Sequence, residues 1–210
     1  LTNDQDDPAV AYSTTSGQYL VVYENSEGNG NILGRFVDAS TGQLMGNFFS
    51  IADGTSRQRN PDVAYDSYRN RFLVVYEDGN EGSRNVVGIL VYGSYQSSGS
   101  QLPTALPTMI ASDGADEYDP AVAYNSDDHQ FAVVYLRSTY IAYGRMVGSG
   151  TTYPDPLGSA GFQVRDYGGG AVHTPDVAWG SEGNTFAAVW TRERSTGDTA
   201  PDYISVYYLY

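Results

Sequence analysis

Short apolar runs alternate with polar and glycine-containing turns along this chain, and one such pattern occurs four times. Each copy starts beside a proline and continues through a small-residue segment, a polar turn and a strongly apolar run. The copies are DPAVAYSTTSGQYLVVYE from Asp7, NPDVAYDSYRNRFLVVYE from Asn60, DPAVAYNSDDHQFAVVYL from Asp119 and TPDVAWGSEGNTFAAVWT from Thr174. Self-similarity at a period of roughly 50 to 60 residues is typical of repeat architectures such as propellers.

Two further apolar patches follow the matched core in most units. Each patch is short, rich in β-branched and aromatic residues, and bounded by Gly, Asn, Asp or Ser, which is the pattern of a β-strand. They cover residues 32–37 and 48–52, then 86–91 and 108–112, then 141–147 and 162–166. No stretch has apolar residues at helical spacing over three turns. The pattern therefore predicts an all-β protein with four strands in each repeat.

Repeated four-stranded units of this length favour a four-bladed β-propeller with four-stranded antiparallel blades. The first strand of each unit carries small residues, such as Ala9, Ala11 and Ala64, as expected for strands crowded near a central axis. We expect a single domain over residues 1–210, with blades at about 7–53, 60–112, 119–166 and 174–210.

The PxVAY…FLVVYE unit resembles the degenerate propeller repeats of predicted secreted and surface proteins of bacteria. The resemblance covers nearly the whole chain. It implies a propeller scaffold and an extracellular or cell-surface location, and it says little about activity, since one fold serves many functions.

The last blade is expected to lack its outer strand, because residues 203–210 (YISVYYLY) correspond to a third strand. A three-stranded blade, a fragment of a larger propeller, or a blade completed by another chain would each explain this. An uncharged outer strand exposes unpaired backbone N–H and C=O groups, so it can pair with a strand of a neighbouring chain. The predicted interface residues are Tyr203, Ile204, Ser205, Val206, Tyr207, Tyr208, Leu209 and Tyr210.

Charge excludes several functions. The formal net charge is −14, and the chain contains Arg but no Lys. An acidic surface with scattered Arg argues against nucleic acid and anionic membranes as partners.

The absence of Lys removes Schiff-base chemistry and P-loop phosphate binding, and the absence of Cys removes disulfides and thiolate chemistry. No window has the eighteen apolar residues of a membrane-spanning helix, so no membrane insertion is expected. Because the chain starts at Leu1, we expect a processed secreted product or a cloned fragment.

Carboxylates gather around the starts of the predicted inner strands, where a propeller would bring them to one mouth of its channel. An acid and a base carboxylate facing a sugar there would make a glycoside hydrolase, with Asp62 and Asp176 as testable members. The competing interpretation is that Asp and Asn before Pro are ordinary turn formers. The residues concerned are Asp4, Asp6, Asp7, Asp62, Asp113, Asp116, Glu117, Asp119 and Asp176.

Asp113, Asp116 and Glu117 form the densest acidic cluster and are the candidate ligands of a Ca²⁺ ion, although no EF-hand motif is present. An exposed acidic loop is the competing interpretation. The two histidines, His129 and His173, are expected to be solvated loop residues rather than members of a catalytic triad.

The favoured function at this point is a non-enzymatic extracellular structural or interaction propeller. It would pair with copies of itself, in an oligomer or a filament, or with another extracellular protein, and would require no cofactor. A carbohydrate-binding, lectin-like module and a propeller glycoside hydrolase are the alternatives. The 19 tyrosines suit either glycan stacking or a protein interface.

Overall fold

The computed structural model describes residues 4–26, 28–95, 106–138, 141–150, 154–157, 161–164, 171–193 and 203–209. All regular structure in these ranges is β-strand. No helix of the length and apolarity needed to cross a membrane occurs among them.

Sixteen strands form four antiparallel sheets, one for each sequence repeat. The first sheet contains β1 (Gln5–Ser13), β2 (Gln18–Asn25), β3 (Asn31–Asp38) and β4 (Leu44–Ala52). The second contains β5 (Gln58–Asp66), β6 (Arg71–Asp78), β7 (Asn85–Tyr92) and β8 (Thr108–Ala111). The third contains β9 (Glu117–Asn125), β10 (Gln130–Arg137) and β11 (Ile141–Gly148), with β12 (Asp155–Pro156) and β13 (Phe162–Val164) both paired to β11. The fourth contains β14 (Val172–Gly180), β15 (Thr185–Arg192) and β16 (Tyr203–Leu209).

The predicted all-β fold with four antiparallel units is confirmed. Residues 203–209 form the third strand of the last sheet, as expected, and β16 is the outermost strand among its described residues. Tyr210 lies outside the described residues, so the pairing of this edge with another chain stays a prediction. The short strand β12 was not predicted, and of the predicted patch 162–166 only residues 162–164 are described as strand.

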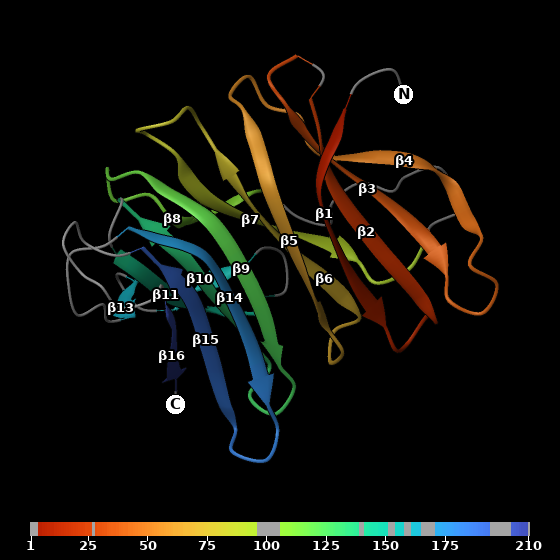
Figure 1. The fold of residues 1–210 in the computed structure, drawn as a ribbon. Helices are drawn as coiled ribbons and strands as arrows, with labels where there is room; N and C mark the ends of the chain where they lie inside the picture. Colours follow the sequence, from red (N-terminus) through yellow and green to blue (C-terminus); the bar gives the residue numbers. More distant parts are fainter. Residues whose placement is uncertain are drawn as a thin grey trace.

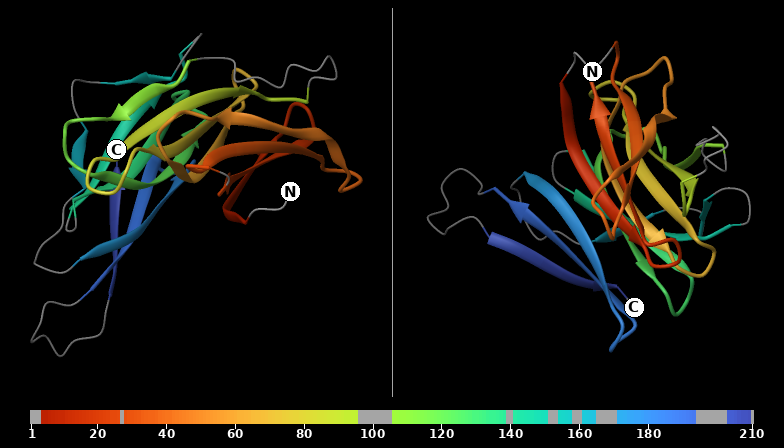
Figure 2. Two further views of the ribbon diagram at one scale, coloured as in Figure 1. Left: turned by 90° about the horizontal axis from the view of Figure 1, so that it is seen from above. Right: turned by 90° about the vertical axis from the view of Figure 1, so that its right-hand side faces the viewer.

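The four sheets follow one another in chain order around an arc, with the first strand of each sheet innermost (Figure 1). Strand β1 packs beside β5, β5 beside β9, and β9 beside β14. The first and fourth sheets lie at the two ends of this arc (Figure 2).

Each junction between sheets is built in the same way. Small and aliphatic residues on one face of a sheet, such as Ala11 and Leu20, pack against larger residues on the facing side of the next sheet, such as Val63 and Phe72. The face that carries Val63 and its equivalents in the other sheets is called the front face below. The other two junctions repeat this arrangement with their own buried clusters. Both faces of the second and third sheets are therefore covered, which is why β6 and β10 are apolar on both sides.

The front face of the first sheet differs because no sheet of the described chain covers it. Val10 is 59% exposed, whereas its counterparts Val63, Val122 and Val177 are 6%, 6% and 8% exposed. The same sequence position therefore has a different environment at the end of the arc.

This difference predicts unequal effects of the same substitution. Val63→Ala is expected to lower the free energy of unfolding by about 1.5–3 kcal/mol, because it removes methyl groups from a packed junction. Val10→Ala is expected to cost less than about 0.5 kcal/mol. Urea unfolding of both variants tests this, and equal losses would show that the front face of β1 is covered in solution.

A left-handed residue interrupts every inner strand directly before its proline. Asp7, Asn60, Asp119 and Thr174 have φ of 49°, 48°, 47° and 45°, and the strand register shifts at each of these positions. Non-glycine residues rarely adopt this conformation, least of all before proline or when β-branched. These four repeated bulges bend the inner strands at one end of the arc.

A glycine in the third strand of each of the first three sheets makes room for the outer strand. A Cβ on Gly34 would lie 2.8 Å from side-chain atoms of Phe49 and Ile51. A Cβ on Gly144 would lie 2.7 Å from the Phe162 ring. The glycine therefore lets a large side chain of the outer strand cross the third strand.

Candidate functional site

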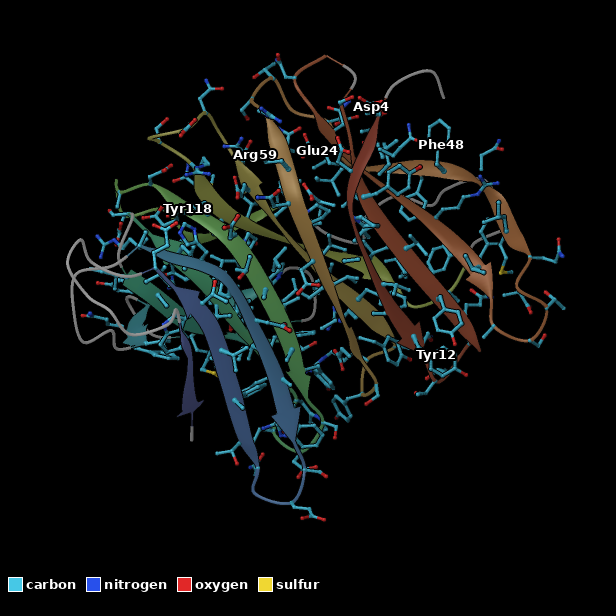
Figure 3. The ribbon with its side chains drawn as sticks, in the orientation of Figure 1. Asp4, Tyr12, Glu24, Phe48, Arg59 and Tyr118 are labelled. Carbon is cyan, nitrogen blue, oxygen red and sulfur yellow. The ribbon has the colours of Figure 1, made fainter. Side chains whose placement is uncertain are left out.

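The four proline bulges line one cavity of about 470 Å³ near the axis of the arc. Each inner strand contributes its left-handed residue, its proline and the residue after it. Arg59 and Tyr118, which lie beside two of the bulges, are at the same end of the sheets, while Tyr12 is at the opposite end (Figure 3). The axial cavity therefore opens where the inner strands begin.

Every inner strand supplies one carboxylate to this axial cavity. In β1 and β9 the acid precedes the proline (Asp7 and Asp119), and in β5 and β14 it follows the proline (Asp62 and Asp176). The expectation that inner-strand carboxylates converge is supported for these four. The other predicted members lie outside the cavity lining: Asp4, Asp6, Asp113, Asp116 and Glu117.

Asp62 ties the second sheet to the third. Its Oδ1 accepts the backbone N–H of Val63 at 2.8 Å, and its Oδ2 accepts that of Val122 at 2.7 Å. Burial raises the pKa of Asp62 to about 6, and the charge of Asp176 adds to this effect, while the two N–H donors offset part of it. Both oxygens are thus engaged in holding two inner strands in place.

Asp119 lies at the edge of a buried ionic network centred on Glu77, whose side chain is fully buried. Glu77 Oε1 accepts the backbone N–H of Asp119 at 2.8 Å and the Asn60 amide at 2.7 Å. The same amide donates to Asp119 Oδ1 at 2.8 Å. Burial and the nearby Glu77 charge raise the pKa of Asp119.

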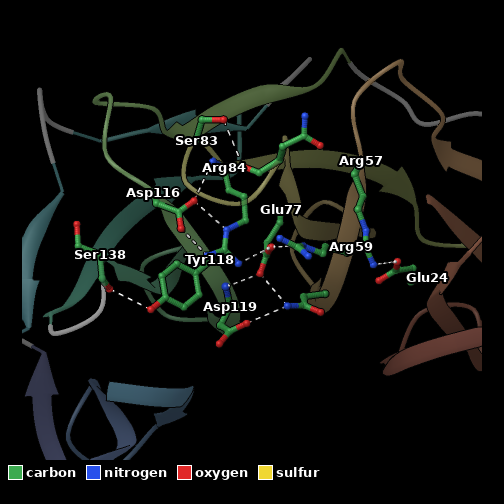
Figure 4. Close-up of polar contacts among 12 residues, drawn as sticks. Glu24, Arg57, Arg59, Glu77, Ser83, Arg84, Asp116, Tyr118, Asp119 and Ser138 are labelled. Carbon is green, nitrogen blue, oxygen red and sulfur yellow. Dashed lines mark hydrogen bonds and ion pairs between the residues drawn. The ribbon is translucent and has the colours of Figure 1, made fainter. Parts of the chain in front are cut away.

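Two arginines pair with Glu77. Arg59 Nε donates to Glu77 Oε2 at 2.7 Å, and Arg84 approaches the same oxygen at 3.4 Å (Figure 4). Arg84 is also held by Asp116, with Nε 2.8 Å from Oδ1. Asp119 is not paired with either arginine in this way, and the neighbouring Glu77 charge is one of the causes that raise its pKa.

A second cavity of about 550 Å³ adjoins the axial cavity and shares Asp119 with it. Its lining is mostly polar and includes Arg84, Tyr118 and, from the fourth sheet, His173. The Arg84 guanidinium lies over the Tyr118 ring, 4.0 Å from its centroid. Asp119 is thus placed between two adjoining spaces at the same end of the sheets.

The predicted metal ligands Asp113, Asp116 and Glu117 are not grouped around one point. Asp113 pairs with Arg137 at 2.7 Å, and Asp116 pairs with Arg84 on the other side of the loop at 2.5 Å. Within the described ranges, no three acidic or histidine side chains are arranged to hold a metal ion. The two arginine pairs argue against a Ca²⁺ site at this loop, and Ca²⁺ binding stays a prediction.

Glu117 is buried and gives this loop a pH-dependent stability. Burial raises the pKa of Glu117 to about 8, and the adjacent Asp113 carboxylate adds to the effect. In the unfolded chain a Glu titrates near about 4.3. Between these values the folded state keeps a proton that the unfolded state loses, so the free energy of unfolding falls as pH rises and levels off above about pH 8.

Replacing Glu117 with glutamine should remove this fall. Relative to the wild type, Glu117→Gln is expected to gain stability from pH 5 to pH 9, by at most about 1.4 kcal/mol per unit of pKa difference. Chemical unfolding at several pH values measures this, with Glu81→Gln as an exposed control. A stability difference that does not change with pH would contradict it.

The two histidines lie in different places. His129 lies in the turn after β9, as expected, but it is only partly exposed, and its ring stacks on Tyr68 with centroids 3.8 Å apart. His173 is exposed, pairs with Glu193 at 3.2 Å and lines the second cavity. His129 and His173 lie in different sheets and do not form a catalytic triad together.

The sequence interpretation missed Glu77, Arg59 and Arg84 as members of a functional site. Glu77 and Glu24 end the same apolar run in two repeats, so sequence position alone makes them equivalent. Only Glu77 is joined to the residues of the axial cavity, whereas Glu24 pairs with the half-exposed Arg57 at 3.2 Å. The sequence feature that could have identified this network is Arg59, directly before Asn60, because the other repeats have no arginine at this position.

The comparisons with known proteins concern the fold. An alpha-L-arabinofuranosidase from Lactobacillus brevis matches with a TM-score of 0.59 at 11% sequence identity, over 96% of this chain and 71% of that one. An endo-arabinase from Bacteroides thetaiotaomicron matches with a TM-score of 0.58 at 10% identity, over 99% and 76%. An N-acetylgalactosamine deacetylase from F. plautii matches with a TM-score of 0.58 at 11% identity, over 97% and 71%. No protein-family model and no curated protein matches the sequence.

These similarities confirm the β-propeller fold and correct the favoured function. The three structures named above, which share this arrangement of sheets over nearly the whole chain, are those of enzymes that act on carbohydrates. The expectation of a non-enzymatic structural module is therefore wrong, and the carbohydrate alternatives are the better supported ones. Pairing with copies of the chain stays a prediction. The propeller fold that the repeat resemblance implied is confirmed, while the extracellular location belongs to the proposal below.

Proposed function

We propose that this protein is an extracellular glycoside hydrolase that cleaves a glycan bound in the axial cavity. One observation carries the proposal: Asp119, a carboxyl group whose pKa is raised, lines this cavity together with carboxylates from the three other inner strands. Glycoside hydrolysis needs one carboxylic acid that donates a proton and one carboxylate on the other side of the scissile bond.

Asp119 is the proposed general acid. Glu77 lies next to it and is paired with Arg59 and Arg84. Burial and the Glu77 charge raise the pKa of Asp119, so Asp119 retains its proton to a higher pH than an ordinary Asp. This proton passes to the glycosidic oxygen as the bond from that oxygen to the anomeric carbon breaks. A leaving alcohol is then released without the cost of forming an alkoxide.

Asp176 is the proposed second carboxylate. It lies on β14, the strand packed beside β9, and its side chain is exposed. Its Oδ1 accepts the N–H of Val177 at 2.8 Å, which orients the group. Asp176 either attacks the anomeric carbon or removes a proton from the attacking water, so that glycoside and water give a free sugar and an alcohol. Asp62, with both oxygens bonded to backbone, positions the strands on either side.

The fold comparisons support this choice over passive glycan binding. Two of the similar structures are named for the hydrolysis of arabinose-containing glycans, and the third for the deacetylation of a sugar. The acidic surface and the absence of Lys are consistent with a neutral glycan rather than a phosphorylated or nucleic-acid substrate.

The test is hydrolysis of a panel of neutral aryl glycosides and of plant and microbial polysaccharides, measured as the release of reducing ends. Activity that falls at least about 100-fold in Asp176→Ala would support the proposal. The control Asp127→Asn changes an exposed turn at the far end of β9 and should keep full activity. Glycan binding without turnover, or turnover that survives Asp176→Ala, would overturn it.

A further inference from the structure

We infer that the second cavity receives the leaving-group side of a neutral oligosaccharide, with Tyr118 as the surface on which the next sugar ring stacks. This inference rests on the proposed function. It goes further by specifying a substrate of at least two linked sugars and by assigning each part of it to one of the two cavities.

The position of Asp119 carries the first step. Asp119 lines both the axial cavity and the second cavity, and no other residue is common to the two linings as described. A general acid must reach the oxygen that joins the cleaved sugar to its leaving group. A bond placed at Asp119 would therefore have one sugar in the axial cavity and the other in the second cavity.

The firm attachment of Tyr118 carries the second step. Its hydroxyl donates to the backbone oxygen of Ser138 at 3.0 Å, and the Arg84 guanidinium lies 4.0 Å from its ring centroid. Arg84 is itself fixed by Asp116 and Glu77. The ring is therefore held from two sides before a ligand arrives (Figure 4). Arg84 covers one face of the ring, and the side chain also packs against the core between the third and fourth sheets. The part of this preorganised ring that lines the second cavity offers an apolar surface to the C–H groups of a sugar at little entropic cost.

The charges around the second cavity carry the third step. Glu81 and Asp116 contribute carboxylates, while the guanidinium of Arg84 is already paired with Asp116 and Glu77. His173 faces the cavity from the fourth sheet and is paired with Glu193. This lining offers acceptors for sugar hydroxyls and opposes a second carboxylate. A neutral sugar fits it better than a uronic acid.

The chemistry at Asp119 is balanced by this placement. The proton of Asp119 goes to the glycosidic oxygen, which leaves with the sugar on Tyr118 as a free hydroxyl group. The sugar in the axial cavity takes its new oxygen from water, through the carboxylate of Asp176. If Asp176 attacks the anomeric carbon, Asp119 regains its proton from the water that then releases the sugar. If Asp176 takes the proton from the attacking water, that proton leaves to solvent and Asp119 is reprotonated from solvent.

The experiment compares two substrates that share the sugar to be cleaved. One carries a nitrophenyl leaving group and the other carries a second neutral sugar. Tyr118→Ala should lower kcat/KM for the disaccharide roughly tenfold or more, because a stacked ring is lost, and should change the nitrophenyl glycoside less than about threefold. Tyr118→Phe keeps the ring and should retain most of the disaccharide activity.

Tyr143→Ala is the matched control. The Tyr143 ring also lies beneath a guanidinium, that of Arg137 at 5.0 Å, but Tyr143 lines neither cavity. It should not change the ratio of the two kcat/KM values. Tyr118→Leu replaces Tyr118→Ala if the alanine variant does not fold.

A binding measurement separates this inference from the proposed function. In the Asp176→Ala protein, calorimetry and aromatic ring NMR are used with the neutral disaccharide, its uronic-acid analogue and the single sugar. Only the neutral disaccharide should shift the Tyr118 ring signals, and Tyr118→Ala should weaken its binding. Three results would each overturn the inference. They are an equal loss of kcat/KM on both substrates in Tyr118→Ala, disaccharide binding that Tyr118→Ala does not weaken, and the absence of disaccharide binding. Loss of turnover alone would overturn only the catalytic proposal.

Discussion

Asp119→Asn is expected to lower kcat by about 10²- to 10⁴-fold on glycosides with a poor leaving group, the range typical of a lost general acid. Asparagine keeps the size of the side chain and can still accept from the Asn60 amide, so the bulge in β9 should be retained. Substrates with an activated aryl leaving group need little proton donation and should keep most of their rate. The dependence of the loss on leaving-group pKa is the signature of an acid.

The pH profile gives a second measure of the same change. Burial and the Glu77 charge raise the pKa of Asp119, so the wild-type rate should fall only when pH rises through this raised value. Asp119→Asn should lose this high-pH fall. An unchanged profile, or equal losses on good and poor leaving groups, would exclude Asp119 as the acid.

Glu77→Ala is expected to lower the free energy of unfolding by about 3–5 kcal/mol, the range measured when one partner of a buried ion pair is removed. The side chains of Arg59 and Arg84 are only 17% and 12% exposed. Arg59 would lose its acidic partner where little water can replace it, and Arg84 would keep only Asp116. The N–H of Asp119 would lose its acceptor as well. Urea unfolding by circular dichroism measures the loss.

Glu24→Ala provides the comparison, because Glu24 has the same position in the first repeat. Its partner Arg57 is 49% exposed and can be solvated after the change. The expected loss is about 1 kcal/mol or less. Similar losses in the two variants would show that the Glu77 network contributes no more than a surface pair, and would remove the reason for placing the proton on Asp119.

The bulges before the prolines show how far the repeat alone could lead. Four copies of an X-Pro step predict four equivalent inner strands, and the structure has them. The left-handed conformation at Asp7, Asn60, Asp119 and Thr174 was not predicted, because sterics disfavour it locally before proline. At Asn60 and Asp119 it is accompanied by hydrogen bonds of the Asn60 amide, to Glu77 in its own sheet and to Asp119 in the next sheet.

The candidate site was predicted in part. The convergence of Asp62 and Asp176 on one mouth follows from equivalent places in equivalent strands, and both line the axial cavity. Their division of roles does not follow from this equivalence. Asp62 has both oxygens bonded to backbone N–H groups, while Asp176 is exposed, since the fourth sheet lies at the end of the arc.

The class of the fold, the number of sheets and the strand order within each repeat follow from the sequence, because alternation, turn residues and repeat length are local properties of the chain. The differences between equivalent residues arise from contacts in the folded protein. Val10 and Val63 differ in burial, and Glu24 and Glu77 differ in their partners. Asp119 becomes a candidate acid through neighbours from another sheet. Burial, charge coupling and cavities depend on contacts between distant segments, and no local pattern encodes them.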